Sequence, residues 1–196
     1  KNQLVLTGAI DNVGAPIREN AGDSYRRGIE LDAGWVFAPN WSWQANLTWS
    51  KNRNKNNYFQ RNGVLQALGD THLSYSPSLI ASDQLTYARD SWSISLVSKF
   101  VGEQYMGNID AELSKLESYS VQDILFQAVV LNKPNAPRLD VNVHIYNLLD
   151  EGYISNGYFY TYDDDWSSPT AVTTIEGVGY YPQAGRHFLA GLTLKF

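Results

Sequence analysis

The chain has 196 residues, a formal net charge of −5 and no cysteine. These features exclude a disulfide framework and a thiolate metal site, and the scattered basic residues argue against nucleic-acid binding. Hydrophobic residues make up 43% of the chain, but no window approaches the roughly 18 consecutive apolar residues of a transmembrane helix. A helical membrane span is therefore excluded.

Alternating apolar and polar residues predict about eight β-strands. The clearest is WSWQANLTWSK, in which the residues at odd positions from Trp41 to Trp49 are apolar and those between them are polar. Asp83 interrupts the apolar face of one predicted strand, and the apolar parity of another changes between Val121 and Ile124. A β-bulge would repair each alternation. The strands are expected near residues 2–10, 23–37, 41–52, 76–88, 91–102, 118–131, 137–148 and 185–196.

The connections between these strands alternate in length. Tight turns near 38–40, 88–90 and 132–137 contrast with long segments near 11–22, 53–75, 103–117 and 149–184, the last without a clear period. Short turns at one end and long loops at the other are typical of outer-membrane barrels. We therefore predict an all-β fold, a transmembrane antiparallel up-and-down β-barrel. A soluble antiparallel sandwich would show the same alternation and stays open as an alternative.

Aromatic residues stand at the ends of the apolar stripes, as in the belts of membrane proteins at the lipid–water interface. Trp41 and Trp49 are eight residues apart. At a strand tilt of about 45° they are separated by roughly 19 Å of depth, compatible with opposite margins of an apolar band about 25 Å tall. The predicted lipid-interface residues are Trp41, Trp43, Trp49, Tyr87 and Trp92.

The final residues, RHFLAGLTLKF, alternate in the same way and end on an aromatic side chain. They resemble the C-terminal β-signal of outer-membrane proteins, which the barrel-assembly machinery recognises. The residues that carry this resemblance are Phe188, Gly191, Leu192, Leu194 and Phe196.

Three stretches, taken in order, resemble TonB-dependent outer-membrane receptors. YYPQAGRHFLAGLTLKF carries a proline followed by Gly-Arg before the last strand, and VNVHIYNLLDEGY resembles the penultimate strand and its exit. NVGAPIRENAGDSYRRGIELDAGW resembles an earlier hairpin. The matching residues are Pro182, Gly185 and Arg186; Asn147, Leu148, Leu149, Asp150 and Tyr153; and Gly14, Gly28, Ile29 and Glu30.

This resemblance implies a nutrient importer of the Gram-negative outer membrane, most simply for a ferric siderophore or similar metal chelate, with no catalytic residue and no cofactor. Family barrels have about 22 strands and an N-terminal plug. We therefore expect residues 1–196 to be the C-terminal portion of such a barrel. The expected partners are outer-membrane lipid, the remaining strands and plug, TonB through the absent N-terminal part, the barrel-assembly machinery and the chelate. An intact eight-stranded barrel with a structural or adhesive role is the alternative.

The segment YISNGYFYTYDDDWSSP is the richest stretch for recognition, because tyrosine and tryptophan supply rigid amphipathic contact surfaces. An ordinary loop covering the barrel mouth is the alternative. Three consecutive aspartates do not match the ligand spacing of a helix-loop-helix calcium site, and His72, His144 and His187 are too scattered to indicate a metal site. The candidate ligand-contact residues are Tyr158, Tyr160, Tyr162, Asp163, Asp164, Asp165 and Trp166.

Overall fold

The computed structural model describes residues 3–10, 16–134, 136–168 and 170–196, with side chains described from residue 22 onward. Gly14, one of the residues in the family resemblance, lies outside the described residues. Within these ranges almost all regular structure is β-strand, with one 3₁₀ turn, η1 (Glu112–Ser114). No helix in the described part of the chain is long and apolar enough to cross a membrane.

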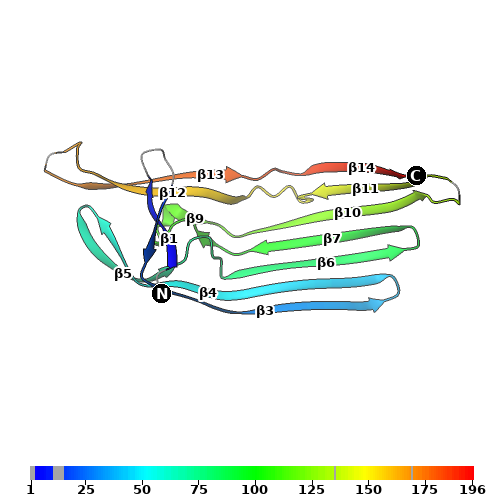
Figure 1. Ribbon diagram of the computed structural model, residues 1–196, viewed down its shortest axis with the longest axis horizontal. Coiled ribbons are helices and arrows are strands. Elements are labelled where there is room, and N and C mark those ends of the chain that lie inside the picture. The colour runs from blue at the N-terminus through cyan, green and yellow to red at the C-terminus, as the bar shows by residue number, and fades with distance from the viewer. Residues whose placement is uncertain (1–2, 11–15, 135, 169) are drawn as a thin grey trace.

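A single antiparallel sheet forms the main body (Figure 1). Its strands follow the order β14-β11-β10-β7-β6-β4-β3, and β5 pairs with the outer part of β4. We call this sheet the wall. The seven strands in this order succeed one another along the chain, and the longest connection between two of them, residues 147–186, joins β11 to β14. The bounds are β3 (Asp23–Ala38), β4 (Trp41–Arg61), β5 (Val64–His72), β6 (Leu79–Arg89), β7 (Trp92–Val101), β10 (Tyr119–Leu131), β11 (Arg138–Tyr146) and β14 (His187–Lys195).

Three small two-stranded sheets accompany the main sheet. All eight predicted strands occur, but the first of them pairs outside the main sheet, so the expectation that it continues the wall is wrong. The long connections are also more regular than expected: β4 extends to Arg61, and residues 149–184 contain a hairpin. The small sheets pair β1 (Gln3–Ile10) with β2 (Pro16–Ala21), β8 (Gln104–Tyr105) with β9 (Lys115–Leu116), and β12 (Ile154–Asp164) with β13 (Thr173–Pro182).

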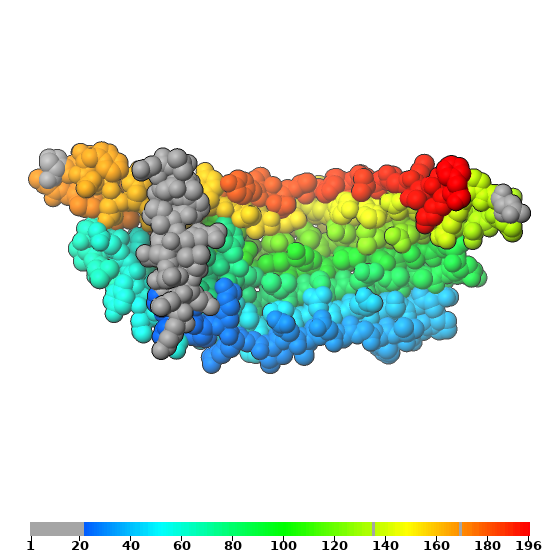
Figure 2. All heavy atoms as spheres, viewed as in Figure 1, coloured from blue at the N-terminus to red at the C-terminus, as the bar shows by residue number. Residues whose placement is uncertain are grey.

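One face of the main sheet is apolar and uncovered. The strand register aligns Leu31 with Leu47 and continues such rows across the sheet. Leu31 is 58% exposed, Leu47 is half-buried, and Leu192 is 75% exposed. Figure 2, which is coloured by chain position, shows one of the two faces of the main sheet, from β3 at the lower edge to β14 at the upper edge. The few buried apolar residues that the structure describes lie toward the long-loop end or in it. A soluble sandwich would bury these rows against a second sheet, so the uncovered rows favour a wall that faces lipid.

The opposite face of the wall is polar. Thr86 and Ser95 lie 2.8 Å apart through their hydroxyl oxygens, and the Gln84 amide donates to both, at 3.0 and 3.3 Å. A polar face alternating with an apolar one is the pattern of a barrel whose interior is wet. The strands at the two edges, β3 and β14, do not pair with each other, so the described wall is an open segment of a barrel.

A row of aromatic rings lies at the short-turn end of the wall. Trp41 contacts Tyr87 with ring centroids 4.9 Å apart, and Tyr87 contacts Trp92 at 5.4 Å. Trp35, Phe37 and Phe126 extend this row of ring contacts in both directions. Trp43 pairs with Trp35 in the register, and Trp49 lies on the same face toward the long-loop end. The aromatic rings thus form a row at the short-turn end, and their place at a lipid–water interface stays a prediction.

Neither of the two bulges suggested by the sequence exists. The register runs without a break through β6, where Asp83 lies opposite Ala45 on one side and Ser98 on the other. The pairing of β10 with β7 is also continuous from Val121 to Ile124. Asp83 therefore stays on the apolar face of the wall.

Candidate functional site

Four aromatic rings form a row along the β12–β13 hairpin, which rises beyond the long-loop end of the wall (Figure 1). Successive ring centroids, from Tyr158 through Tyr160 and Tyr162 to Trp166, are 6.3, 6.3 and 5.8 Å apart, and neighbouring ring planes differ by at most 16°. Alternate residues of a strand share one face, which explains the alignment of the three tyrosines. We call these four residues the aromatic ladder. Trp166 is 69% exposed and Tyr158 50%, so the ladder is open to a ligand.

Glycines in β13 make room for the ladder. Gly179 lies opposite Tyr158 in the register, and Gly177 lies opposite Tyr160. A side chain at either glycine would overlap the tyrosine ring that lies across it. The rings are therefore held against the hairpin backbone, which reduces the conformational entropy lost on ligand binding.

The other face of the hairpin docks on the segment that follows β7. The Phe159 ring lies against Gly107, where an added Cβ would be 2.8 Å from a ring carbon. The connection between β5 and β6 also contacts this face, since the Tyr75 hydroxyl donates a 2.6 Å hydrogen bond to the Gly157 carbonyl. Burial raises the pKa of Tyr75, so this hydroxyl keeps its proton at neutral pH. The hairpin thus has one docked face and one open face.

The three candidate aspartates have different surroundings. Asp163 accepts hydrogen bonds from the Thr174 hydroxyl at 2.6 Å and the Gln60 amide at 3.1 Å. Asp164 accepts hydrogen bonds from the backbone amides of Trp166 and Ser167. The Ser167 hydroxyl, and after it the Ser167 amide, donate to this carboxylate and hold its pKa below the ordinary value. Asp165 lies exposed. The first two carboxylates are therefore engaged in shaping the hairpin.

The tip of the β4–β5 hairpin binds the β12–β13 hairpin, although the two are far apart in sequence. Arg61 forms a 2.6 Å ion pair with Glu176. Asn62 and Thr174 exchange two hydrogen bonds: the Asn62 amide donates to the Thr174 hydroxyl at 2.7 Å, and the Thr174 amide donates to the Asn62 side-chain oxygen at 2.8 Å. We call these contacts the hairpin bridge. They hold the ladder at a fixed place above the wall.

Replacing Arg61 with alanine should loosen the bridge without unfolding the wall. The pair is partly exposed, so we expect a loss of about 0.5–1 kcal/mol, measured as faster hydrogen exchange of the β12–β13 amides. Arg89→Ala, which removes an exposed pair at the opposite end of the wall, is the control. Exchanging the charges in Arg61→Glu with Glu176→Arg should restore protection, and failure to do so would argue against the ion pair as the cause.

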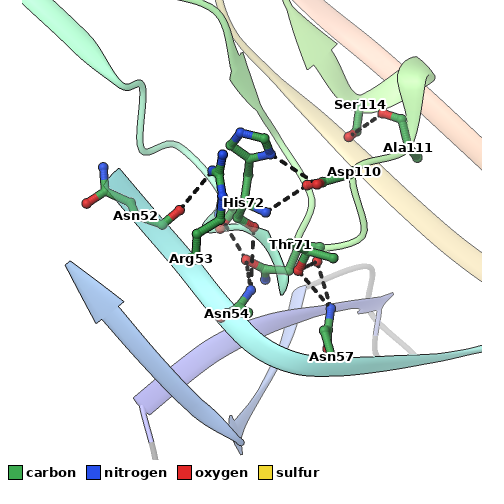
Figure 3. A network of polar contacts seen from close by, with 11 residues as sticks. Asn52, Arg53, Asn54, Asn57, Thr71, His72, Asp110, Ala111 and Ser114 are labelled. Atoms are coloured by element: carbon green, nitrogen blue, oxygen red, sulfur yellow. Dashed lines mark hydrogen bonds and ion pairs between the residues drawn. The ribbon is translucent and has the colours of Figure 1, made fainter. Parts of the chain in front are cut away.

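A second polar network fastens the segment after β7 to the β4–β5 hairpin (Figure 3). Asp110 accepts a 2.8 Å hydrogen bond from the His72 backbone amide, and its other oxygen lies 3.0 Å from His72 Nδ1. The Thr71 hydroxyl and the Asn57 amide both donate to the Asn108 carbonyl, at 2.7 and 2.8 Å. This network is satisfied within the protein and needs no ligand.

The three histidines are in separate surroundings. His72 stacks on Tyr105, whereas His144 and His187 both contact Tyr146 on the polar face of the wall. No group of three or more histidine, aspartate or glutamate side chains in the described part of the chain is arranged to hold a metal ion.

Comparison with known proteins decides the family. The sequence profile described as TonB dependent receptor-like, beta-barrel, matches residues 1–148, which is 148 of the 196 residues. The chain belongs to the TonB-dependent receptor family. It is thus a β-barrel protein of the Gram-negative outer membrane, with short turns on the periplasmic side and long loops outside.

Solved receptors share this fold. The ferric yersiniabactin uptake receptor FyuA of Yersinia pestis matches with a TM-score of 0.64 and 20% identity, over 91% of this chain and 24% of that one. The ferric-catecholate import receptor Fiu of E. coli K12 gives 0.63 and 19%, over 99% and 23%. The copper transporter OprC gives 0.64 and 19%, over 100% and 27%. The chain thus spans about a quarter of these receptors' length. No curated protein sequence matches it significantly.

The Asn-Leu-Leu-Asp segment of this receptor chain forms a compact junction after β11. Asn147 is 4% exposed and has a φ of 50°. Its side-chain amide donates to the Glu151 carbonyl at 2.8 Å, and its side-chain oxygen accepts from the Glu151 backbone amide at 2.9 Å. The Asp150 carboxylate accepts from the Arg186 amide at 2.7 Å, and a Cβ at Gly185 would lie 2.7 Å from the same oxygen. The junction thus joins the exit of β11 to the start of β14, which explains why the two resembling stretches occur together.

The last strand lies as the receptor resemblance implies. It pairs with β11 without a break from Tyr146 opposite His187 to Arg138 opposite Lys195. Gly191 lies on the polar face, where a Cβ would meet the Asn142 amide at 2.7 Å. Recognition of this last strand by the barrel-assembly machinery stays a prediction. The predicted outward residues are exposed: Phe188, Leu192, Leu194 and Phe196.

Proposed function

We propose that this chain forms one sector of the wall and several external loops of a receptor that imports a ferric siderophore or a similar metal chelate. The observation that carries the proposal is the aromatic ladder, which is exposed, aligned and held above the wall by the hairpin bridge. Family membership supports transport, and FyuA and Fiu are named for ferric chelates. The chain's part in import is binding without catalysis.

The remaining strands, a plug and TonB complete the proposed receptor. In this division of labour the ladder captures the chelate outside, and the plug gates its passage under the action of TonB. Planar aromatic side chains suit this task because they offer large contact areas with few rotatable bonds. The exposed Asp165 beside the ladder would disfavour anionic groups at the hairpin tip, which places an anionic chelate nearer to the tyrosines.

The test is chelate binding by the full receptor with Tyr160→Ala and Tyr162→Ala combined. Loss of two aligned contact surfaces should weaken binding about tenfold or more, because well-packed aromatic contacts each contribute on the order of 1 kcal/mol. Ferric catecholate, ferric citrate and Cu(II) are the probes, and binding is followed by quenching of tryptophan fluorescence.

The matched control is Tyr58→Ala, which removes an exposed tyrosine of the β4–β5 hairpin. It should leave affinity within about twofold, as for most peripheral contacts. Equal loss in both variants, or no binding of any probe, would contradict the ladder as the contact site. Tight binding without TonB-dependent uptake by cells would instead support the adhesive alternative.

A further inference from the structure

One register row on the lipid-facing side of the wall has no large apolar side chain. The adjacent row nearer the short turns contains Trp43, Leu85 and Leu96. The adjacent row nearer the long loops contains Leu47 and Phe100. The row between these two takes one residue from each of five neighbouring strands, and each of its residues is paired in the register with the residue on the next strand. The row consists of Ala33, Ala45, Asp83, Ser98 and Gln122.

The row forms the floor of a groove. A shallow hollow of about 490 Å³ lies over its first four members, between Leu31, Leu47 and Phe100 on one side and Trp43 on the other. Alanine and serine leave the floor low, and the aromatic and leucine side chains raise the walls. We call this feature the lateral groove.

Two polar groups in the lateral groove have no partner in the described part of the protein. The Asp83 carboxylate is half-buried, and no ion pair or hydrogen bond joins it to another described residue. The Gln122 side-chain oxygen is buried without a hydrogen bond, while its amide donates to Ser120 at 2.9 Å. Both unpaired groups are acceptors, but only Asp83 lines the hollow, so the groove calls for hydrogen-bond donors at the Asp83 carboxylate.

The groove crosses the membrane obliquely. On β4 the outward apolar residues run from Trp41 to Trp49, with Ala45 midway. The register pairs Trp43 on β4, strand by strand, with Ile145 on β11. Ile145 is the last outward apolar residue of β11 on the extracellular side. Such a shift is expected of strands tilted by about 35–45°. The next row therefore leaves the apolar band at Gln122, passes through Ser98 and reaches mid-depth at Asp83.

We propose that the lateral groove admits water and the donor groups of outer-leaflet lipid headgroups as far as Asp83, so that the bilayer is locally thinned beside β6, β7 and β10. A carboxylate in dry hydrocarbon loses its hydration, whereas a bilayer thins at modest cost. The groove opens at the headgroup margin, and its unpaired atoms match the ammonium and hydroxyl donors found there. This inference depends on the membrane wall and not on the transported substrate.

The absence of cysteine from the chain makes a direct test available. Ser98→Cys and Ile94→Cys place single thiols on the same face of β7, one in the groove and one four residues nearer the short turn. Asn46→Cys, on the polar face, reports full labelling. The full receptor, with no other reactive cysteine, is reconstituted in vesicles of phosphatidylethanolamine and phosphatidylglycerol, whose headgroups carry ammonium and hydroxyl donors, and is treated with a charged maleimide. Because thiolate formation needs water, we expect labelling of Ser98→Cys at least about tenfold faster than that of Ile94→Cys.

Three outcomes would overturn the proposal. Equal, slow labelling at positions 98 and 94 would show a dry groove. Fast labelling in vesicles but protection in native outer membranes would show that a protein covers the groove in place of lipid. Adding Asp83→Leu to Ser98→Cys should slow labelling toward the Ile94→Cys rate, and an unchanged rate would remove Asp83 as the cause. Only protease-resistant, folded receptor is counted in each arm.

Discussion

Replacing Asn147 with alanine is expected to lower the free energy of unfolding by about 2–4 kcal/mol, which is a large loss for one polar side chain. Its amide donates to the carbonyls of Glu151 and Ala184, and its oxygen accepts from the Glu151 amide, all in a site that is only 4% exposed. Alanine leaves these backbone groups without partners and is also disfavoured at φ 50°. Urea unfolding of the receptor in lipid, followed by tryptophan fluorescence, measures the loss.

Two further variants separate the causes. Asn147→Gly accepts the positive φ but still removes the side-chain bonds, so it should recover only the conformational part, about 1 kcal/mol. Asn46→Ala, at an exposed position on the polar face of β4, should change stability by less than about 0.5 kcal/mol. A loss at Asn147 no greater than at Asn46 would contradict the role assigned to the junction.

Leu47→Arg should lower the free energy of unfolding of the receptor in a bilayer by about 2 kcal/mol or more, whereas Thr48→Arg should change it little. Leu47 lies on the apolar face of β4, between Trp49 and the midpoint at Ala45, and Thr48 lies on the polar face. The two variants add the same charge at neighbouring residues. Their difference therefore reports which face meets lipid, measured as the unfolding free energy in vesicles. Equal effects would contradict the orientation of the wall.

The wall was predictable because its strands obey a local rule. From Trp41 to Trp49 each residue's face follows from its parity, and the register carries that face to the neighbouring strands. Asp83 shows where the rule misleads. The sequence suggested a bulge to turn this carboxylate away from lipid, but unbroken pairing with β4 and β7 keeps it in place. The hydrogen bonds of two complete ladders outweigh the burial of one side chain, which the groove leaves half-exposed.

The hairpins outside the wall were harder to predict, because long-range contacts stabilise them. Tyr158, Tyr160 and Tyr162 were identified as contact candidates, and their alternation is the signature of β12, but the surrounding glycine and aspartate are also typical of a loop. Arg61 was not identified, because its partner Glu176 is 115 residues away and nothing in the local sequence marks the pair. The proposed capture residues were therefore accessible to sequence reasoning, but the contacts that fix their position were not.

The uncovered apolar rows have a consequence for how the chain matures. A wall whose apolar side chains do not pack against other parts of the protein has no stable form in water, so its folding and its insertion into lipid occur together. Until then, the same side chains together with unpaired strand edges would drive self-association during transit through the aqueous periplasm. We therefore expect this architecture to need rapid insertion, or shielding of the apolar rows until insertion, whatever ligand the receptor binds.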